Sequence, residues 1–272
     1  MNPPLEKCLK AHLERFAPLS QQGKQGVGWA ALNLKTGTST VFQSRRFLAA
    51  STIKLPILAM YAQRRQASVF QEPYAYRAED HVEDSPFFEK YALAESHRAA
   101  KTPLAWDTLA EWMMILSDNA ATNLLIRQLG LEAIQHWIET HGFSETVLAR
   151  VMMDLEARAQ GRENWTTPED MLHFMTRLVR GELLPPEPTR WMLDILHRCE
   201  DPEKIPFLFT PPVQVANKPG ELPGLRADVG YVHTPERALI ISVFCDGIAP
   251  EHEEACDHWQ AELAKILWET LL

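Results

Sequence analysis

The sequence lacks any long apolar run and any recognisable secretion signal. None of its hydrophobic stretches reaches the roughly 18 consecutive apolar residues that a membrane-spanning helix needs. The chain starts with MNPPLEKCLK, which contains no apolar core of the kind found in signal peptides. We therefore expect a cytoplasmic protein with no membrane partner, or a secreted one if a leader has been removed.

Cysteine is scarce and widely spaced, which argues against a metal or redox centre. The four cysteines are Cys8, Cys199, Cys245 and Cys256. No two of them form the C-x-x-C pair of a zinc knuckle or a redox dithiol, so reduced and mostly buried thiols are expected. His252 and His258 lie near Cys256, but helical register turns His258 away from the other two. We expect a solvated helix face there, with no metal and no cofactor.

The sequence also has no excess of positive charge. The formal net charge is −9, and no basic stripe or alternation of basic and aromatic residues is visible. Such a surface repels phosphate backbones and anionic lipids, so nucleic acid is not an expected partner. A small molecule or a peptide is more consistent with this composition, and we expect a monomer.

The chain does contain ample material for a core. Hydrophobic residues make up 46% of the 272 positions and charged residues 23%, with eight tryptophans and eleven phenylalanines. This composition is typical of a globular protein, and the length allows one large domain or two lobes. No internal repeat or low-complexity tract is visible in the sequence.

Hydrophobic periodicity and turn residues predict the order helix, two strands, a long helical region, three strands, helix. The predicted segments are a helix at 5–19, strands at 27–34 and 38–43, helices between 51 and 197, strands at 213–217, 226–232 and 238–245, and a helix at 251–272. Turns are predicted at 219–221 and 234–237, and the prolines at 185–188 indicate a linker before the helix at 189–197.

This order of elements predicts an α+β fold. The simplest packing joins the first and last strands in one five-stranded antiparallel sheet flanked by the terminal helices. Residues 1–272 then form a single domain with a sheet lobe, residues 1–50 and 207–272, and an all-helical lobe, residues 51–206. A substrate site is expected between the two lobes.

One short stretch combines a hydroxyl and an amine one helical turn apart. In ASTIKLP, residues 50–56, Ser51 and Lys54 share a face if a helix begins near Ser51. The helix N-terminus would then place free N–H groups and a positive dipole end beside the serine oxygen. A lysine in a dry pocket can lose its proton and activate such a serine as a nucleophile. The alternative is a helix-capping serine followed by a surface lysine, because one S-x-x-K match is expected by chance in a chain of this size.

Two further motifs make the pattern specific. Besides Ser51-x-x-Lys54, the chain carries S-D-N at 117–119 and K-P-G at 218–220. In this order the three motifs resemble the S-x-x-K, S-D-N and K-T-G signature of class A β-lactamases and penicillin-binding proteins, the third in two of its three places. The resemblance covers roughly residues 27–272, and it implies the β-lactamase and transpeptidase-like fold.

The resemblance implies acyl-transfer chemistry for the first two motifs. Ser51 would attack an amide or ester carbonyl and form an acyl-enzyme, with Lys54 accepting its proton. Ser117 would bridge Lys54 and the leaving group and pass the proton onward. Asp118 is expected to be structural.

The remaining motif residues would bind the substrate. The resemblance implies that Asn119 contacts the side-chain amide of the substrate and that Lys218 supplies positive charge for a carboxylate. The backbone N–H groups of Ser51 and Glu221 would form an oxyanion hole, with Gly220 beside them in the strand. The alternatives are a helix-capping asparagine at position 119 and a turn lysine at position 218.

The loop between the second and third motifs departs from the family pattern. Arg150 and Asn164 resemble the pair that closes the neck of this loop, although the family more often has aspartate at the second position. Counted from Arg150, the glutamate that activates the hydrolytic water would fall at Met152, and methionine is not a base. Asp154 and Glu156 are the nearby carboxylates that could act as the deacylation base if the loop folds differently.

A second departure concerns the third motif. Pro219 replaces a residue whose hydroxyl would normally hold the carboxylate of the substrate, and Glu221 adds a negative charge at the same strand edge. We therefore expect a β-lactamase-type serine hydrolase that acts on β-lactams or related amides, esters or peptides through an acyl-Ser51 intermediate. The alternatives are a carboxylesterase or D-alanyl peptidase of the same fold, and a non-catalytic binder or sensor of cell-wall fragments.

Overall fold

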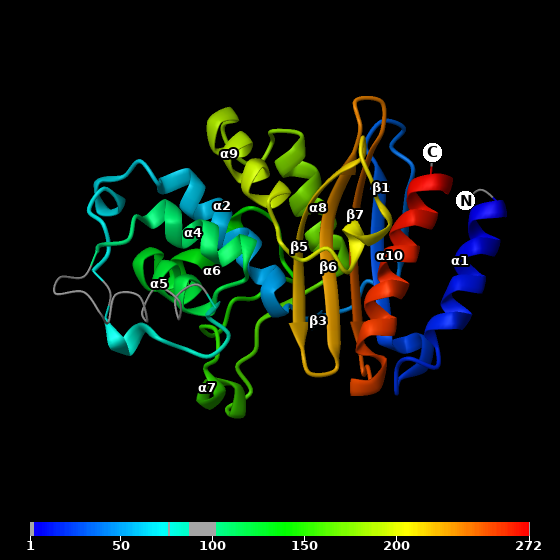
Figure 1. Cartoon of the computed structure of the whole chain (residues 1–272), viewed down its shortest axis with the longest axis horizontal. Coiled ribbons are helices and arrows are strands. Elements are labelled where there is room, and N and C mark those ends of the chain that lie inside the picture. The colour runs from blue at the N-terminus through cyan, green and yellow to red at the C-terminus, as the bar shows by residue number, and fades with distance from the viewer. Residues whose placement is uncertain (1–2, 76, 87–101, 272) are drawn as a thin grey trace.

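A five-stranded antiparallel sheet forms one half of the protein (Figure 1). The computed structural model describes residues 3–75, 77–86 and 102–271. The strands follow the order β2-β1-β7-β6-β5, so the first and last parts of the chain pair directly. Their bounds are β1 Val27–Asn33, β2 Ser39–Phe42, β5 Gln214–Leu222, β6 Leu225–His233 and β7 Ala238–Asp246. The predicted α+β fold and its sheet are confirmed.

The other elements are α-helices, short 3-10 helices and two short paired strands, β3 and β4. The α-helices are α1 Pro3–Phe16, α2 Lys54–Arg64, α4 Trp106–Ile115, α5 Asn119–Leu129, α6 Leu131–Thr140, α7 Leu155–Ala159, α8 Pro168–Val179, α9 Pro186–His197 and α10 Glu253–Thr270. The short elements are η1 Gly23–Gly26, β3 Phe47–Leu48, η2 Ala50–Ile53, η3 Ser68–Phe70, η4 Ala78–Asp80, β4 Trp165–Thr166, η5 Ile205–Leu208 and η6 Pro250–His252. Residues 76 and 87–101 of the predicted helical lobe lie outside the described residues.

Alternating side chains on β7 serve two separate cores. One face of the sheet is covered by the terminal helices α1 and α10 (Figure 1), and Ile241 and Val243 pack there. Ile240 and Phe244 belong to the larger core on the opposite face. This alternation is the period-two pattern of a strand that is buried on both sides.

Helix α8 covers the inner face of the sheet, although its residues fall within the segment predicted as the helical lobe. Pro168 occupies the first turn of α8, and Thr167 caps the helix by accepting a hydrogen bond from the N–H of Asp170. The hydroxyl of Ser242 on β7 donates to the carbonyl of Pro168 at 2.5 Å. The sheet and the helical part of the chain are thus joined through this helix.

Helix α2 lies at the centre of the helical half. Every residue from Lys54 to Ala62 is buried, and helices α4, α5, α6 and α9 surround α2. A helix that is apolar on all sides is stable only when it is enclosed in this way. Its first residue, Lys54, directly follows η2, which carries Ser51 and packs against strand β5, so both residues have fixed positions.

Two predictions that took proline as the mark of a turn or a linker are wrong. In both places the prolines lie in or at the start of a regular element, at positions where no backbone N–H is needed. The expected turn at 219–221 is part of β5, which continues to Leu222, and the chain turns instead at Gly224, where φ is +76°. Pro219 fits there because β5 is the edge strand and bonds to a neighbour on one side only. The expected linker at 185–188 is the start of α9, because proline needs no N–H partner in the first turn.

Candidate active site

The first motif lies where a short 3-10 turn joins the central helix. Ser51 is inside η2, and Lys54 is the first residue of α2, with its backbone N–H donating to the carbonyls of Ser51 and Thr52. The α-helix thus begins at Lys54, later than expected. Ala50, immediately before the serine, has a φ of +45°, in the left-handed region that side-chain-bearing residues rarely adopt. Such positions are typical of functional sites, where surrounding contacts hold the strained backbone.

Lys54 is completely buried, and its amine faces the second motif. The Nζ atom donates to Ser117 O at 2.6 Å and to Asn119 Oδ1 at 2.9 Å, and it lies 3.1 Å from Ser117 Oγ. The amide nitrogen of Asn119 donates to the carbonyl of Glu83 at 3.4 Å, which fixes the orientation of this side chain. The structure therefore brings together the first two predicted motifs.

The surroundings of Lys54 favour the neutral amine. Burial lowers the pKa of Lys54 well below its ordinary value, and the positive charge of Lys218 adds to this effect, outweighing nearby carboxylates. Nζ is the donor in all three of its contacts, and the carbonyl oxygens of Ser117 and Asn119 can only accept. A neutral amine has two N–H groups and one lone pair, so these two carbonyl oxygens are enough to bind its N–H groups. Its lone pair can then accept a proton.

The direct contact expected between Ser51 and Lys54 is not made. Within the described residues, no hydrogen bond joins Ser51 Oγ to Lys54 Nζ, because Ser117 and Asn119 occupy the hydrogen-bonding positions of the amine. Catalytic hydrogen bonds are often long in ligand-free proteins and tighten when substrate binds. Ser51 itself is half-buried and borders a cavity that Ser117 and Asn119 also line.

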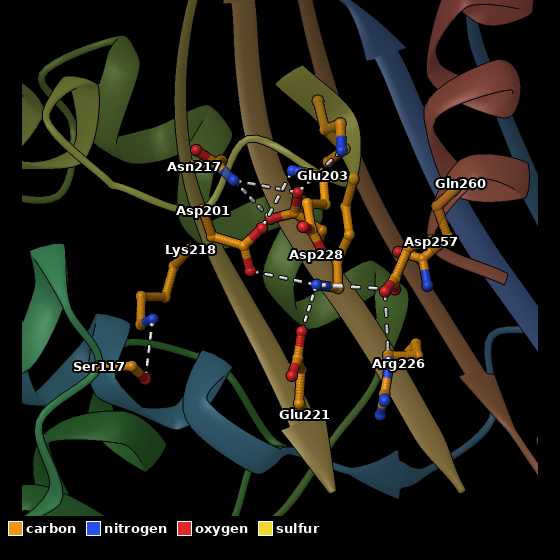
Figure 2. Close-up of polar contacts among 12 residues, drawn as sticks. Ser117, Asp201, Glu203, Asn217, Lys218, Glu221, Arg226, Asp228, Asp257 and Gln260 are labelled. Carbon is orange, nitrogen blue, oxygen red and sulfur yellow. Dashed lines mark hydrogen bonds and ion pairs between the residues drawn. The ribbon is translucent and has the colours of Figure 1, made fainter. Parts of the chain in front are cut away.

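Ser117 connects the amines of two buried lysines. It lies in the turn between α4 and α5 with a φ of +59°, and Asp118 caps α5 by accepting from the N–H of Ala121 at 2.9 Å, a structural use that agrees with expectation. Lys218 donates to Ser117 Oγ at 3.1 Å from the other side (Figure 2). Burial lowers the pKa of Lys218 as well. The third motif thus meets the first two at one hydroxyl group.

Strand β5 approaches the nucleophile so closely at Gly220 that a larger residue does not fit freely. A Cβ atom at this position would lie 3.1 Å from Ala50 Cβ and 3.2 Å from both Ser51 N and Thr52 Cγ2. The absence of a side chain therefore lets the end of β5, including the next residue, Glu221, lie beside the backbone N–H of Ser51.

We expect Gly220→Ala to slow acylation of Ser51 about tenfold or more, because the strand end would have to move by a few tenths of an ångström from Ser51. Acylation rates measured by stopped-flow mixing with an activated ester would test this. Gly230→Ala is a matched control, since its Cβ would meet Ile205 Cδ1 and Cγ2 at 3.1 and 3.3 Å and Asn217 Cβ at 3.5 Å, with no atom of Ser51 among these neighbours. An unchanged acylation rate in Gly220→Ala, measured per folded molecule, would contradict the expectation.

Two adjoining cavities open on Ser51. The larger has a volume of about 630 Å³ and is lined in part by Ser51, Ser117, Asn119, Lys218 and Glu221. The smaller has a volume of about 270 Å³, shares Ser51, Asn119 and Glu221 with the first, and extends to the loop that carries Met152. The larger cavity is of the size that small-molecule sites usually have.

The larger cavity has an acidic lining. Asp84, Glu200, Asp201 and Glu221 all border it, whereas Lys218 is the one basic residue among its described lining residues. The expected negative charge of Glu221 at this edge is therefore accompanied by three further carboxylates. Its own carboxylate accepts a hydrogen bond from Lys204, a contact that no local sequence pattern predicts.

The neck of the loop is closed as expected, but through different atoms. Asn164 Oδ1 accepts from the backbone N–H groups of Ala149 and Arg150 at 2.9 and 3.1 Å, and its Nδ2 donates to Arg150 O at 3.1 Å. The guanidinium of Arg150 pairs instead with Glu163 at 2.7 Å. Asn164 thus binds the backbone of Arg150, and the neighbouring Glu163 supplies the negative charge that pairs with the Arg150 guanidinium group.

The suggested deacylation bases have other roles in the structure. Asp154 caps α7 by accepting from the N–H of Ala157 at 2.9 Å. Glu156 is exposed and accepts from Gln160 Nε2 at 3.3 Å. Neither residue lines either cavity at Ser51, whereas Met152 lines the smaller one. The expectation that one of these carboxylates reaches the hydrolytic water has no support from their positions.

Glu163 is the carboxylate from this loop that does line the smaller cavity, and the sequence analysis missed it. It bridges Arg150 at 2.7 Å and Arg158 at 3.0 Å. Both of its carboxylate oxygens are therefore engaged by guanidinium groups, Oε2 by Arg150 and Oε1 by Arg158. The available signal was its charge complementarity with two arginines of the same loop.

The fold and the meeting of the three motifs beside one cavity define the β-lactamase and transpeptidase-like class of proteins. The model of the β-lactamase enzyme family matches residues 8–271, so the chain belongs to this family.

Similar proteins agree with this assignment. A β-lactamase from Bacillus licheniformis is 23% identical and covers 98% of this chain and 87% of its own length. β-Lactamase 3 from Bacillus cereus is 27% identical over 94% of this chain and 80% of its own length. The crystal structure of a β-lactamase from Sphaerobacter thermophilus superposes with a TM-score of 0.81 at 24% identity, covering 98% of both chains. At this identity the structural likeness establishes the fold.

Among the described residues, no helix is both long and apolar enough to cross a bilayer. The same residues contain no cluster of at least three histidine, cysteine or carboxylate side chains suited to a metal ion. All four cysteines are free thiols, two of them buried.

Proposed function

We propose that this protein is a serine hydrolase of the β-lactamase type that forms an acyl-enzyme on Ser51. The observation that carries the proposal is the hydroxyl of Ser117 held between two buried lysine amines next to the nucleophile. The lowered pKa of Lys54 supports its use as the base. Membership of the β-lactamase enzyme family makes a small-molecule β-lactam, or a related ester or peptide, the proposed substrate.

The acylation step follows from these contacts. Ser51 Oγ attacks the carbonyl carbon of the substrate, and its proton passes to Lys54 Nζ as the new C–O bond forms. The proton then moves through Ser117 Oγ to the leaving nitrogen or oxygen as the scissile bond breaks. The backbone N–H groups of Ser51 and Glu221 would stabilise the oxyanion, a contribution of about 3 to 4 kcal/mol per donor. No cofactor is required for this sequence of steps.

Two observations favour a related activity over rapid penicillin hydrolysis. Met152 occupies the smaller cavity where a base for deacylation would be needed. The acidic lining of the larger cavity opposes the carboxylate that penicillins carry, and Pro219 offers it no hydroxyl. A carboxylesterase or D-alanyl peptidase acting on substrates without a recognition carboxylate is therefore the second candidate. We further propose a monomer that binds neither nucleic acid nor membranes.

We expect exposure of the protein to penicillin, cephalosporin and short-chain ester panels to give a mass increase confined to the peptide containing Ser51. Intact-mass spectrometry followed by peptide mapping measures this, and Ser51→Ala should show no adduct. A persistent adduct indicates acylation with slow release, and substrate loss without an adduct indicates turnover. If no compound reacts, and ligand binding is the same in Ser51→Ala, the protein is a non-catalytic binder of cell-wall fragments and the proposal fails.

A further inference from the structure

A group of charges centred on the buried Lys204 lies beside strand β5. Asp201, Glu221 and Asp257 approach one another there from the loop before η5, from β5 and from α10 (Figure 2). The amine of Lys204 lies between them. It is bonded to Glu221, lies 3.1 Å from Asp201 Oδ2, and lies 3.6 Å from Asp257 Oδ1. One ammonium group thus joins three separate elements of the fold.

Lys204 is the charge on which this group depends. Its side chain has no exposed surface. Burial by itself would lower the pKa of Lys204, but the carboxylates of Asp201, Asp257 and Glu221 together raise it. Burial, with a smaller effect from Asp201, raises the pKa of the neighbouring Asp228 to about 7, and the charge of Lys204 opposes this rise. Loss of the lysine would leave several carboxylates without a compensating charge.

The two faces of β5 connect this group to the active site. Lys218 bonds to Ser117 on the site face, whereas Asn217 bonds to Asp228 on the other face at 3.0 and 3.1 Å. Because side chains alternate along a strand, Glu221 projects to the same side as Asn217. Its backbone, however, directly follows Gly220, the residue that packs against Ser51. Glu221 therefore contacts the Lys204 group through its side chain and adjoins the active site through its backbone.

Glu221 is only half-buried, and it lines both cavities at Ser51. A carboxylate that is free to turn toward Ser51 would repel the negative charge that develops on the carbonyl oxygen during acylation. Its ion pair with Lys204 holds it toward Asp201 and neutralises it. Among the described strands, β5 pairs only with β6, so no ladder of hydrogen bonds from a second strand holds its end.

We propose that Lys204 is a positioning residue for acylation, which fixes the end of β5 and keeps the carboxylate of Glu221 away from the oxyanion. The inference rests on the proposed acylation of Ser51. Lys204 itself does not line either cavity, and so it acts through Glu221 without touching the substrate.

A double-mutant cycle tests the proposal. Lys204→Met should lower the acylation rate constant of Ser51 at least about tenfold, with the affinity for the intact substrate changed much less, because the effect falls on the transition state. In a Glu221→Gln background, where the carboxylate that Lys204 holds away from the oxyanion is absent, the same Lys204→Met change should lower the rate by less than about threefold. Lys204→Arg should retain most of the parent rate.

The measurement is the rate of adduct formation on Ser51, divided by the folded fraction from circular dichroism. Glu253→Gln is the matched control, since it breaks an ion pair with Arg226 in the same region without touching Lys204, and it should acylate at the parent rate. The inference would be overturned if Lys204→Met lowered the acylation rate equally in the parent and in the Glu221→Gln background. It would also be overturned if Lys204→Met in the parent background acylated at the parent rate per folded molecule. A parent protein that reacts with no compound would instead refute the proposed function.

Discussion

Replacing Lys54 with methionine is expected to reduce acylation of Ser51 by about 10²- to 10⁴-fold, the usual contribution of a positioned general base. The change removes the group that accepts the serine proton, and it leaves the carbonyl oxygens of Ser117 and Asn119 without a donor. The rate of adduct formation, followed by rapid quench and intact mass, measures the loss. Thermal unfolding of the same variant separates lost chemistry from lost structure.

The pH dependence of the parent protein provides a second test of the same residue. The base acts in its neutral form, so acylation should rise with pH as the Lys54 amine loses its proton and fall as the pH drops below its pKa. Because burial lowers this pKa well below the ordinary value of 10.5, the rise should come at a much lower pH than for a surface lysine.

Lys54→Arg is the informative control, since arginine keeps the charge and the donors but does not lose a proton in proteins. We expect this variant to be about as inactive as Lys54→Met. If Lys54→Arg acylates at a rate near that of the parent, the residue serves as a fixed positive charge, and its assignment as the base is wrong.

The fold was predictable because its elements carry strong local signals. The closing helix predicted at 251–272 is α10, Glu253–Thr270, and the nearly continuous apolar run predicted as a strand at 238–245 is β7, which is buried on both faces. The errors arose where a local signal had two meanings. Pro219 reads as a turn residue, and only the position of β5 at the edge of the sheet allows it inside a strand. That position depends on pairing with β6, which no local pattern reveals.

The candidate site was predictable in its residues but not in its contacts. The motifs place Ser51, Lys54 and Ser117 in one site, whereas the direction of the Lys54 amine is set by oxygen atoms more than sixty positions away. The ion pairs around Lys204 could not be predicted from the sequence for a similar reason. The residues that form them come from a loop, an edge strand and the last helix, and nothing in their own neighbourhoods pairs them.

The second large effect is expected from Met152→Glu, which should shorten the lifetime of the acyl-enzyme by about 10²-fold or more by supplying a base for the hydrolytic water. The smaller cavity holds Met152 together with Ser51 and Asn119. The backbone of Met152 is fixed by Asn123, whose side chain accepts from its N–H at 2.8 Å and donates to its carbonyl at 3.0 Å. The new carboxylate would therefore enter the cavity on a rigid support.

The lifetime of the adduct on Ser51 after removal of excess substrate measures this effect, and Met152→Gln is the matched control. Glutamine has the same size as glutamate and can hold a water molecule by hydrogen bonds, but it cannot accept a proton. We expect the adduct to persist in the parent and in Met152→Gln and to disappear rapidly in Met152→Glu. If the glutamate and glutamine variants release the acyl group at the same rate, a base at this position is not what limits turnover, and the explanation for slow deacylation must lie with the geometry of the acyl group beside Gly220 and Glu221.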